Sequence, residues 1–297
     1  MNSDWPALPL DAWRTTYETL HLWMQIVGKI CLQLAPPANH YWNVAFRVDP
    51  RGLVTPLLPY ENRPFGFRFN FNDHRLEIWC CDGGSRQIPL QPMTVAEFYN
   101  QVMGELAEMG IHIKIWTMPV EIANPIRFTE DTVHRDYDPE YAHAFWRVLV
   151  TINPILETFR SEFVGKCSPV HFFWGGFDVA VTRFSGRAAP SRPERGAMYA
   201  EAYSHEVISH GFWPGSGSVQ EAAFYAYAAP QPEHFPEAAV EPADAHYVQD
   251  MGLYVLPYEA VRTADYPENE LRSFLQTTYD AAATLAGWKR GELERRH

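Results

Sequence analysis

The pattern of apolar and polar positions predicts a long amphipathic helix at the start of the chain. Apolar residues recur there at the spacing of helical turns, after Asp11 as the capping residue: Trp13, Tyr17, Leu20, Met24, Val27 and Cys31. The opposite face carries a polar row, made of Arg14, Glu18, His21, Gln25 and Lys29. Such a row is usually solvated, and the alternative is that it forms one wall of a cleft.

Short runs that alternate apolar and polar residues come next and predict an antiparallel meander. The clearest run has Phe at every second position, beside Gly, Arg and Asn, as in a strand with one buried face. The runs are separated by short turn sequences rich in Asp, Asn, Pro and Gly, and strands joined in this way pair antiparallel. The expected strands are 41–48, 53–58, 65–71 and 75–81.

Helix signals close the first half of the chain. Thr94 and Glu97 have the spacing of a capping box, in which each side chain bonds the other residue's backbone N–H. The helix that they open should end at Gly110, because glycine adopts the left-handed conformation that terminates a helix. The alternating run 111–116 then predicts a strand.

The second half repeats this order of elements. Asp138 is a helix cap with Pro139 at the first helical position, and Pro154 predicts a kink. A last helix opens at Pro267. Between these helices the expected strands are 170–174, 177–184, 202–209, 224–228 and 253–256.

We therefore predict an α+β fold, with antiparallel sheets and helices packed on one face, in two similar lobes. The lobes are residues 1–125 and 126–297, packed as one globular unit. In each of them a Gly-Lys pair precedes an aromatic strand that begins at a histidine, His40 in the first and His171 in the second. A tandem duplication would explain this repetition, although matches this short also arise by chance.

Composition restricts the classes of partner. Residues of the apolar set make up 46% and charged residues 20%, which is enough apolar content to bury a core. With a net charge of -12, the chain lacks the excess of positive charge that is typical of proteins that bind nucleic acid or anionic membranes. We find no run of about 18 apolar residues and no secretory signal, so we expect a cytoplasmic protein whose partner is a small molecule.

The segment 201–206 carries the best candidate for catalysis. His205 is of a type that acts as a base or metal ligand near neutral pH, and Glu206 of a type that shuttles protons. In a strand these two side chains point to opposite faces, with Tyr203 on the face of His205. We predict His205, Glu206 and His171 as catalytic residues. The plainer interpretation is a strand with one buried, hydrogen-bonded histidine.

Histidines at the starts of expected strands indicate a metal site. If the lobes are related by pseudo-symmetry, His40 and His171 would face each other. A third imidazole would then complete a site for a divalent transition metal with an open coordination position. The predicted ligands are His21, His40, His171 and His205. Spacing alone does not bring them together.

Aromatic and basic residues predict where a ligand binds. The chain has 10 Trp, 15 Tyr and 18 Phe, which either fill the core or line the deep aromatic pocket that is typical of small-molecule sites. Lys166 precedes Cys167, where a cation could lower the thiol pKa, although free cysteine is more often buried and inert. The predicted ligand-binding residues are Trp174, Tyr203, Trp213, Arg183 and Lys166.

Four segments carry a resemblance to a known family. They read TLHLWMQIVGK (19–29), GKCSPVHFFWGGFDVAVTRFSGR (165–187), YSHEV (203–207) and GFWPG (211–215). The chain resembles, from Trp5 to about Trp288, an uncharacterised bacterial family catalogued as domain of unknown function 5996. The resemblance implies a bacterial single-chain protein and supplies no reaction, cofactor or catalytic residue. Serine is the commoner residue of that family where this chain has Cys167, which weakens a catalytic role for the thiol.

These observations predict an enzyme that acts on a small organic molecule through an aromatic pocket with a His/Glu site, dependent on a metal if the histidines converge. The alternative is a non-catalytic protein that binds a small ligand in the same pocket. A third interpretation, a structural or interaction protein, has the least support. Convergence on one cavity would favour catalysis, and dispersal would favour the binding protein or the structural protein. The residues that decide this are His21, His40, His171, His205 and Glu206.

Overall fold

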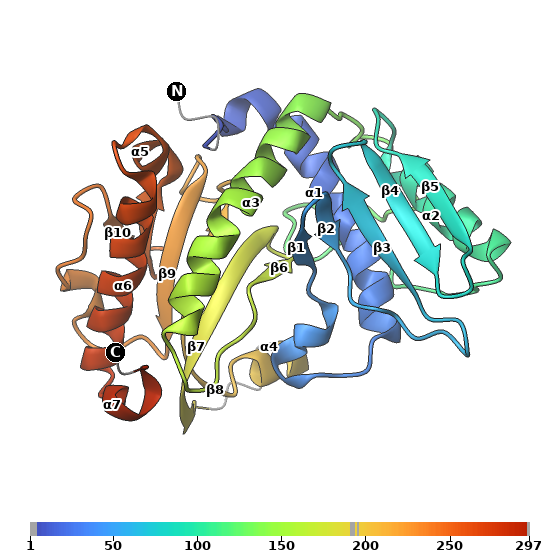
Figure 1. Ribbon diagram of the computed structural model, residues 1–297. Helices are drawn as coiled ribbons and strands as arrows, with labels where there is room; N and C mark the ends of the chain where they lie inside the picture. The colour runs from blue at the N-terminus through green and yellow to red at the C-terminus, as the bar shows by residue number, and fades with distance from the viewer. Residues whose placement is uncertain (1–4, 191–193, 195, 296–297) are drawn as a thin grey trace.

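The computed structural model describes residues 5–190, 194 and 196–295. Its first half consists of α1 (Leu10–Leu34), the 3-10 helix η1 (Asn39–Val44), β1 (Arg47–Asp49), β2 (Gly52–Val54), β3 (Phe65–Asn70), β4 (Arg75–Cys80), β5 (Ser85–Pro89) and α2 (Val95–Glu108). The second half consists of α3 (Pro139–Ser161), β6 (His171–Phe173), β7 (Asp178–Ala188), α4 (Ala197–Ala202), β8 (His205–Trp213), β9 (Ala223–Ala229), the 3-10 helix η3 (Phe235–Glu237), β10 (His246–Val248), β11 (Leu253–Pro257), α5 (Tyr258–Thr263), α6 (Pro267–Leu285) and α7 (Arg290–Leu293). The fold is α+β, as predicted (Figure 1).

Two antiparallel sheets form the framework. The first is a five-stranded meander in the order β1-β2-β3-β4-β5, and the second has six strands in the order β10-β11-β9-β8-β7-β6. The edge of one meets the edge of the other through Phe46 and Phe172. The N–H of each donates to the carbonyl of the other, at 2.9 and 2.8 Å. One apolar core runs through both halves of the chain.

Helices cover one face of each sheet. In the first half, Phe98 of α2 stacks on Trp23 of α1, with ring centroids 4.7 Å apart, and also contacts Phe69 of β3. In the second half, α3 and α6 lie over the sheet, and α3 crosses in front of β7 in Figure 1. His210 of β8 points to these helices, because its Nε2 lies 3.0 Å from the Thr278 hydroxyl of α6.

Local signals predicted most helices and strands correctly. Thr94 and Glu97 form the expected capping box, and the Asp138 carboxylate caps α3. The strand expected at 41–48 is wrong in its first part, because His40 and Tyr41 take left-handed backbone angles inside η1. The strand expected at 111–116 does not form either.

The N-terminal part of the run 202–209 is also not a strand. Residues 197–202 form α4, and β8 begins only at His205. The halves share the order helix, meander, helix, but His40 lies in η1 whereas His171 begins β6. The correspondence on which the predicted duplication depended is therefore not found. Among the described residues, no helix is both long and apolar enough to cross a membrane.

Candidate active site

A row of tyrosines lies on the face of the second sheet opposite α3 and α6. Gly211 of β8 pairs with Tyr225 of β9 on one side and with Ala180 of β7 on the other. A Cβ on Gly211 would lie 2.4 Å from the Tyr225 hydroxyl, so the tyrosine ring crosses β8 where only glycine leaves room. We call this surface the tyrosine face; it consists of Asp178, Ala180, Thr182, Ser209, Gly211, Tyr225 and Tyr227.

The crossing brings the Tyr225 hydroxyl to Asp178, the first residue of β7. This hydroxyl donates to Asp178 Oδ2 at 2.5 Å. Burial, with a smaller contribution from the nearby Glu121 carboxylate, raises the pKa of Asp178 to about 7, although the hydrogen bond from Tyr225 lowers it. Asp178 therefore titrates near neutral pH, where a carboxyl group can both donate and accept a proton.

Glu121 reaches the same place from a loop that α1 holds. Gln25 of α1 bonds both backbone groups of Val120: its Nε2 donates to the carbonyl and its Oε1 accepts from the N–H, each at 2.8 Å. The next residue, Glu121, has φ 56°, in the left-handed region that non-glycine residues seldom adopt. Of the polar row of α1, His21, Gln25 and Lys29 are thus buried, and His21 and Gln25 contact the site at Gly175 and Val120.

The two carboxylates converge on the turn before β7. A Cβ on Gly176 would lie 2.9 Å from Asp178 Oδ1 and 3.5 Å from Glu121 Oε2, so these oxygens are no farther apart than the sum of the two distances. Glu121 is exposed as a whole residue, yet burial of its carboxylate raises its pKa. Phe177, between the turn and Asp178, also has a left-handed φ of 56°. Strained backbone at both carboxylates is typical of functional sites.

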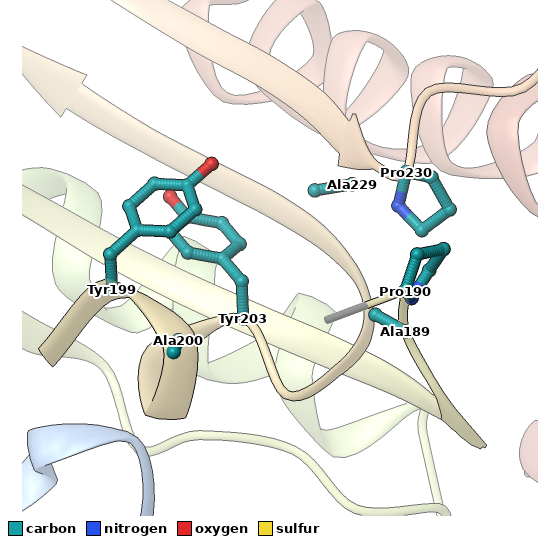
Figure 2. Close-up of a pocket in the computed structure, with 7 residues that line it drawn as sticks. All are labelled: Ala189, Pro190, Tyr199, Ala200, Tyr203, Ala229 and Pro230. Atoms are coloured by element: carbon teal, nitrogen blue, oxygen red, sulfur yellow. The ribbon is translucent and has the colours of Figure 1, made fainter. Parts of the chain in front are cut away.

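A chain of hydroxyls continues along the tyrosine face. The Tyr203 hydroxyl lies 2.9 Å from that of Tyr227, which hydrogen-bonds Ser209, and the Ser209 hydroxyl lies 2.9 Å from that of Thr182. Figure 2 shows Tyr203 beside Tyr199 at a small pocket, with Pro190 and Pro230 on its other side. Tyr203 thus lines this small pocket, and its role in ligand binding stays a prediction.

A second polar group lies at the other end of β7. His40 donates from Nδ1 to the carbonyls of Ala202 and Glu201, at 3.0 and 3.1 Å, and its Nε2 accepts from Lys166 Nζ at 2.6 Å. The His205 ring lies 5.8 Å from that of His40, centroid to centroid. Burial lowers the pKa values of His40 and Lys166. We call His40, Lys166 and His205 the lysine–histidine group.

The structure does not unite the predicted catalytic residues. Glu206 points away from His205 and bonds Arg187 and Ser185, at 2.7 and 2.9 Å. His171 is buried, and burial lowers its pKa to about 4, with nearby arginines adding to the effect. Glu206 and His205 cannot share one substrate because adjacent strand residues face opposite sides of the sheet.

The predicted metal ligands are also dispersed. His21 Nε2 donates to the Gly175 carbonyl at 2.8 Å, near Asp178 at the start of β7. His40 instead packs against Phe184, six residues farther along the strand, with ring centroids 4.6 Å apart. In the part of the chain that the structure describes, no three His, Cys, Asp or Glu side chains are placed to hold a metal ion. The predicted site of His21, His40, His171 and His205 is therefore not formed.

Two of the predicted ligand-binding residues are core residues. Trp174 is buried against Gly28 and donates from Nε1 to the Val44 carbonyl at 2.9 Å. Trp213 is buried against Tyr225. Burial raises the pKa of Cys167 to about 11, so this thiol is not activated.

Comparison with known proteins identifies the family and nothing beyond it. The profile of the Family of unknown function (DUF5996) matches residues 5–295. The chain belongs to this family. No curated protein and no solved structure matches it significantly. For this member of DUF5996, any activity has to be argued from the site itself.

Asp178, Glu121, Tyr225 and Tyr227 were missed by sequence reasoning. A signal was present, since Gly175-Gly176 turns the chain two residues before Asp178, and the segment 223–229 consists of alanines and aromatic residues. Only the fold brings Glu121 to this turn.

Gln25→Leu should weaken the placement of Glu121. The substitution leaves the Val120 N–H and carbonyl without their partner, and an unsatisfied buried polar group costs about 1–3 kcal/mol. We expect a loss of about 2 kcal/mol in the free energy of unfolding, measured by urea denaturation. Gln101→Leu on the exposed face of α2 is the control and should change little. Equal stability of both variants would show that Gln25 does not hold Val120 in place.

Proposed function

We propose that the protein is an enzyme that transfers protons on a small organic molecule bound at the tyrosine face. The convergence of Asp178 and Glu121 on the Gly175-Gly176 turn carries this proposal. Two carboxyl groups whose environments differ are a common basis for acid–base catalysis. Asp178 accepts a hydrogen bond from Tyr225 and Glu121 does not, which favours different roles for them.

In this proposal Asp178 is the general acid and Glu121 the base. A pKa near 7 leaves Asp178 partly protonated at neutral pH, so its proton is available to a leaving or carbonyl oxygen. Glu121 is the more exposed carboxylate and takes a proton from the substrate or from a water molecule. Tyr203 and Tyr227 supply ring faces and hydroxyls for binding, which suits a molecule with an apolar surface and a few polar groups.

The lysine–histidine group has a binding role in this scheme. Lys166 is exposed and lies over the rings of Phe184 and Trp42, at 4.9 and 5.5 Å from their centroids. Its ammonium group and the His205 imidazole would hold an oxygen-bearing end of a long substrate. The proposal therefore keeps His205 and replaces its partner Glu206 by the carboxylate pair.

The test is a search for compounds that bind and are then converted. A metabolite library is screened by thermal shift, and each hit is followed by ¹H NMR with wild type, Glu121→Gln and Glu130→Gln. We expect at least one hit to be converted, with Glu121→Gln still binding it but acting about 10²–10⁴-fold more slowly, the usual share of acid–base catalysis. Glu130 is exposed and outside the site, so its variant should match wild type.

A different result would favour the non-catalytic alternative. If a hit binds tightly and stays unchanged with every variant, the tyrosine face belongs to a binding protein. If Glu121→Gln converts the compound as fast as wild type, the carboxylate pair is not the catalytic centre. The dispersal of the predicted histidines favours this alternative, so the catalytic proposal depends on the carboxylate pair.

A further inference from the structure

A cavity of about 580 Å³ lies on the other side of the second sheet, between α3 and α6. Its volume is in the range of small-molecule sites, about 300–1,000 Å³. Arg183 of β7 contributes to its lining, with Glu162 just after α3, Arg272 and Gln276 of α6, and Arg295. Because Arg183 and Asp178 point to opposite faces of β7, the cavity is separate from the proposed active site.

Arg183 is a buried cation that the protein only partly satisfies. It is 1% exposed. Its Nη2 donates to the Phe159 carbonyl, whereas its Nε is buried and has no partner among the described residues. The guanidinium carbon lies 3.5 Å from the centre of the Phe159 ring and 4.3 Å from that of Tyr279. These rings hold the guanidinium in place and offer no negative charge.

No carboxylate of the described chain forms an ion pair with Arg183. Glu294 lines the cavity, but it accepts from the Tyr279 hydroxyl at 2.9 Å and pairs with Arg290. Arg272, at the cavity wall, pairs with Glu268 at 2.7 Å. A buried charge is normally paired and hydrogen-bonded, since leaving it alone costs several kcal/mol. The cavity is therefore lined by a buried cation whose Nε–H has no partner among the described residues.

We propose that this cavity binds a small organic oxyanion, a molecule with a carboxylate or phosphate group, through Arg183. The planar guanidinium suits both groups, and Nε–H is the donor that has no partner among the described residues. The cavity is larger than a bare ion needs, and side chains such as Gln276 and Ser273 offer polar contacts to the rest of the molecule. The ligand is therefore an organic anion and not a simple salt ion.

The experiment observes the Arg183 Nε–H directly. Protein labelled with ¹⁵N-arginine is titrated at pH 7 with citrate, which carries carboxylates, and in parallel with glycerol 3-phosphate. We expect a saturable shift of the Arg183 Nε–H resonance with one of the two probes, which also distinguishes carboxylate from phosphate as the preferred group. The Arg183 resonance is assigned as the one that is missing from the spectrum of Arg183→Lys.

Because Arg183→Lys changes a buried residue, a second variant leaves the arginine intact. Thr158→Trp adds a large side chain to the α3 wall of the cavity and should weaken binding at least tenfold. Arg86→Gln is the control, because Arg86 pairs with Glu105 in the first half of the chain. This variant should bind the probe as wild type does. The proposal is overturned if neither probe moves the Arg183 resonance in large excess. It is equally overturned if Thr158→Trp shows the same shifts as wild type, because the effect would then be ionic screening.

Discussion

Replacing Asp178 by asparagine should stabilise the protein at pH 8 and leave its stability almost unchanged at pH 4. Burial raises the folded-state pKa of Asp178 from 3.8 to about 7. Between these values the unfolded chain has lost the proton and the folded chain keeps it. Wild-type stability therefore falls as pH rises from about 4 to about 7, and the penalty is complete above that range.

The size of the effect follows from the same shift. Each pKa unit corresponds to about 1.4 kcal/mol. Because solvent reaches this half-buried carboxylate, the effect should be smaller than the full shift implies. We expect Asp178→Asn to gain about 2–3 kcal/mol in the free energy of unfolding at pH 8 relative to pH 4. Asparagine stays neutral and still accepts from Tyr225. Urea denaturation of both proteins across this range measures the difference.

Asp82→Asn provides a control of opposite sign. Hydrogen bonds from the Gly84 N–H and from Arg63 lower the pKa of Asp82 in the folded protein below the unfolded value of 3.8. The Asp82 carboxylate therefore stabilises the fold above pH 3.8, and this stabilisation is lost as the pH falls through the folded-state pKa. Its variant should lose stability at pH 8 and approach wild type in acid. A pH-independent difference for Asp178→Asn would show that this carboxyl titrates normally. The acid role proposed for it would then fail.

The stability penalty at Asp178 bears on function. A half-buried carboxyl that destabilises the fold at neutral pH has no structural benefit that its neutral analogue lacks. Proteins carry such groups mainly at functional sites, where activity and stability conflict. The same reasoning applies to Glu121 and Phe177, whose left-handed backbone a glycine would adopt at lower cost.

Sequence reasoning succeeded where the signal was local. The capping box at Thr94 and the cap at Asp138 depend on residues three or fewer positions apart, and the alternation in β3 and β4 reflects one buried face of a meander. It failed at His40, because the left-handed turn there is held by carbonyls of Glu201 and Ala202, about 160 positions away.

The carboxylate pair could not be predicted for a similar reason. Glu121 lies in a loop without regular structure, and only Gln25, 95 positions earlier, fixes its neighbour Val120. No periodicity links these residues to Asp178. The histidines showed the reverse problem, since a histidine and an aromatic run after a Gly-Lys pair in each half suggested a shared site that the fold does not form.

Gly28→Ala should destabilise the protein although it replaces glycine inside a helix. A Cβ at this position would lie 2.1 Å from the ring of Trp174. The bond from Trp174 Nε1 to the Val44 carbonyl restrains that buried ring. Alanine gains at most about 1 kcal/mol in helix propensity, whereas overpacking costs about 1–3 kcal/mol, and loss of the Trp174 bond adds about 1 kcal/mol. We expect a net loss of about 2–3 kcal/mol in urea denaturation.

Gly104→Ala is the matched control, because it also lies inside a helix, α2, and a Cβ there meets no atom within 4 Å. It should gain up to about 1 kcal/mol. Trp174→Leu in the Gly28→Ala background should cost less than the sum of the two single changes, as expected for residues in contact. If Gly28→Ala and Gly104→Ala behave alike, Trp174 does not pack against α1. Gly175 and Gly176 directly follow Trp174, so displacement of the Trp174 ring should also disturb the carboxylate pair. Gly28→Ala should therefore weaken binding of the compound that the screen identifies, together with stability.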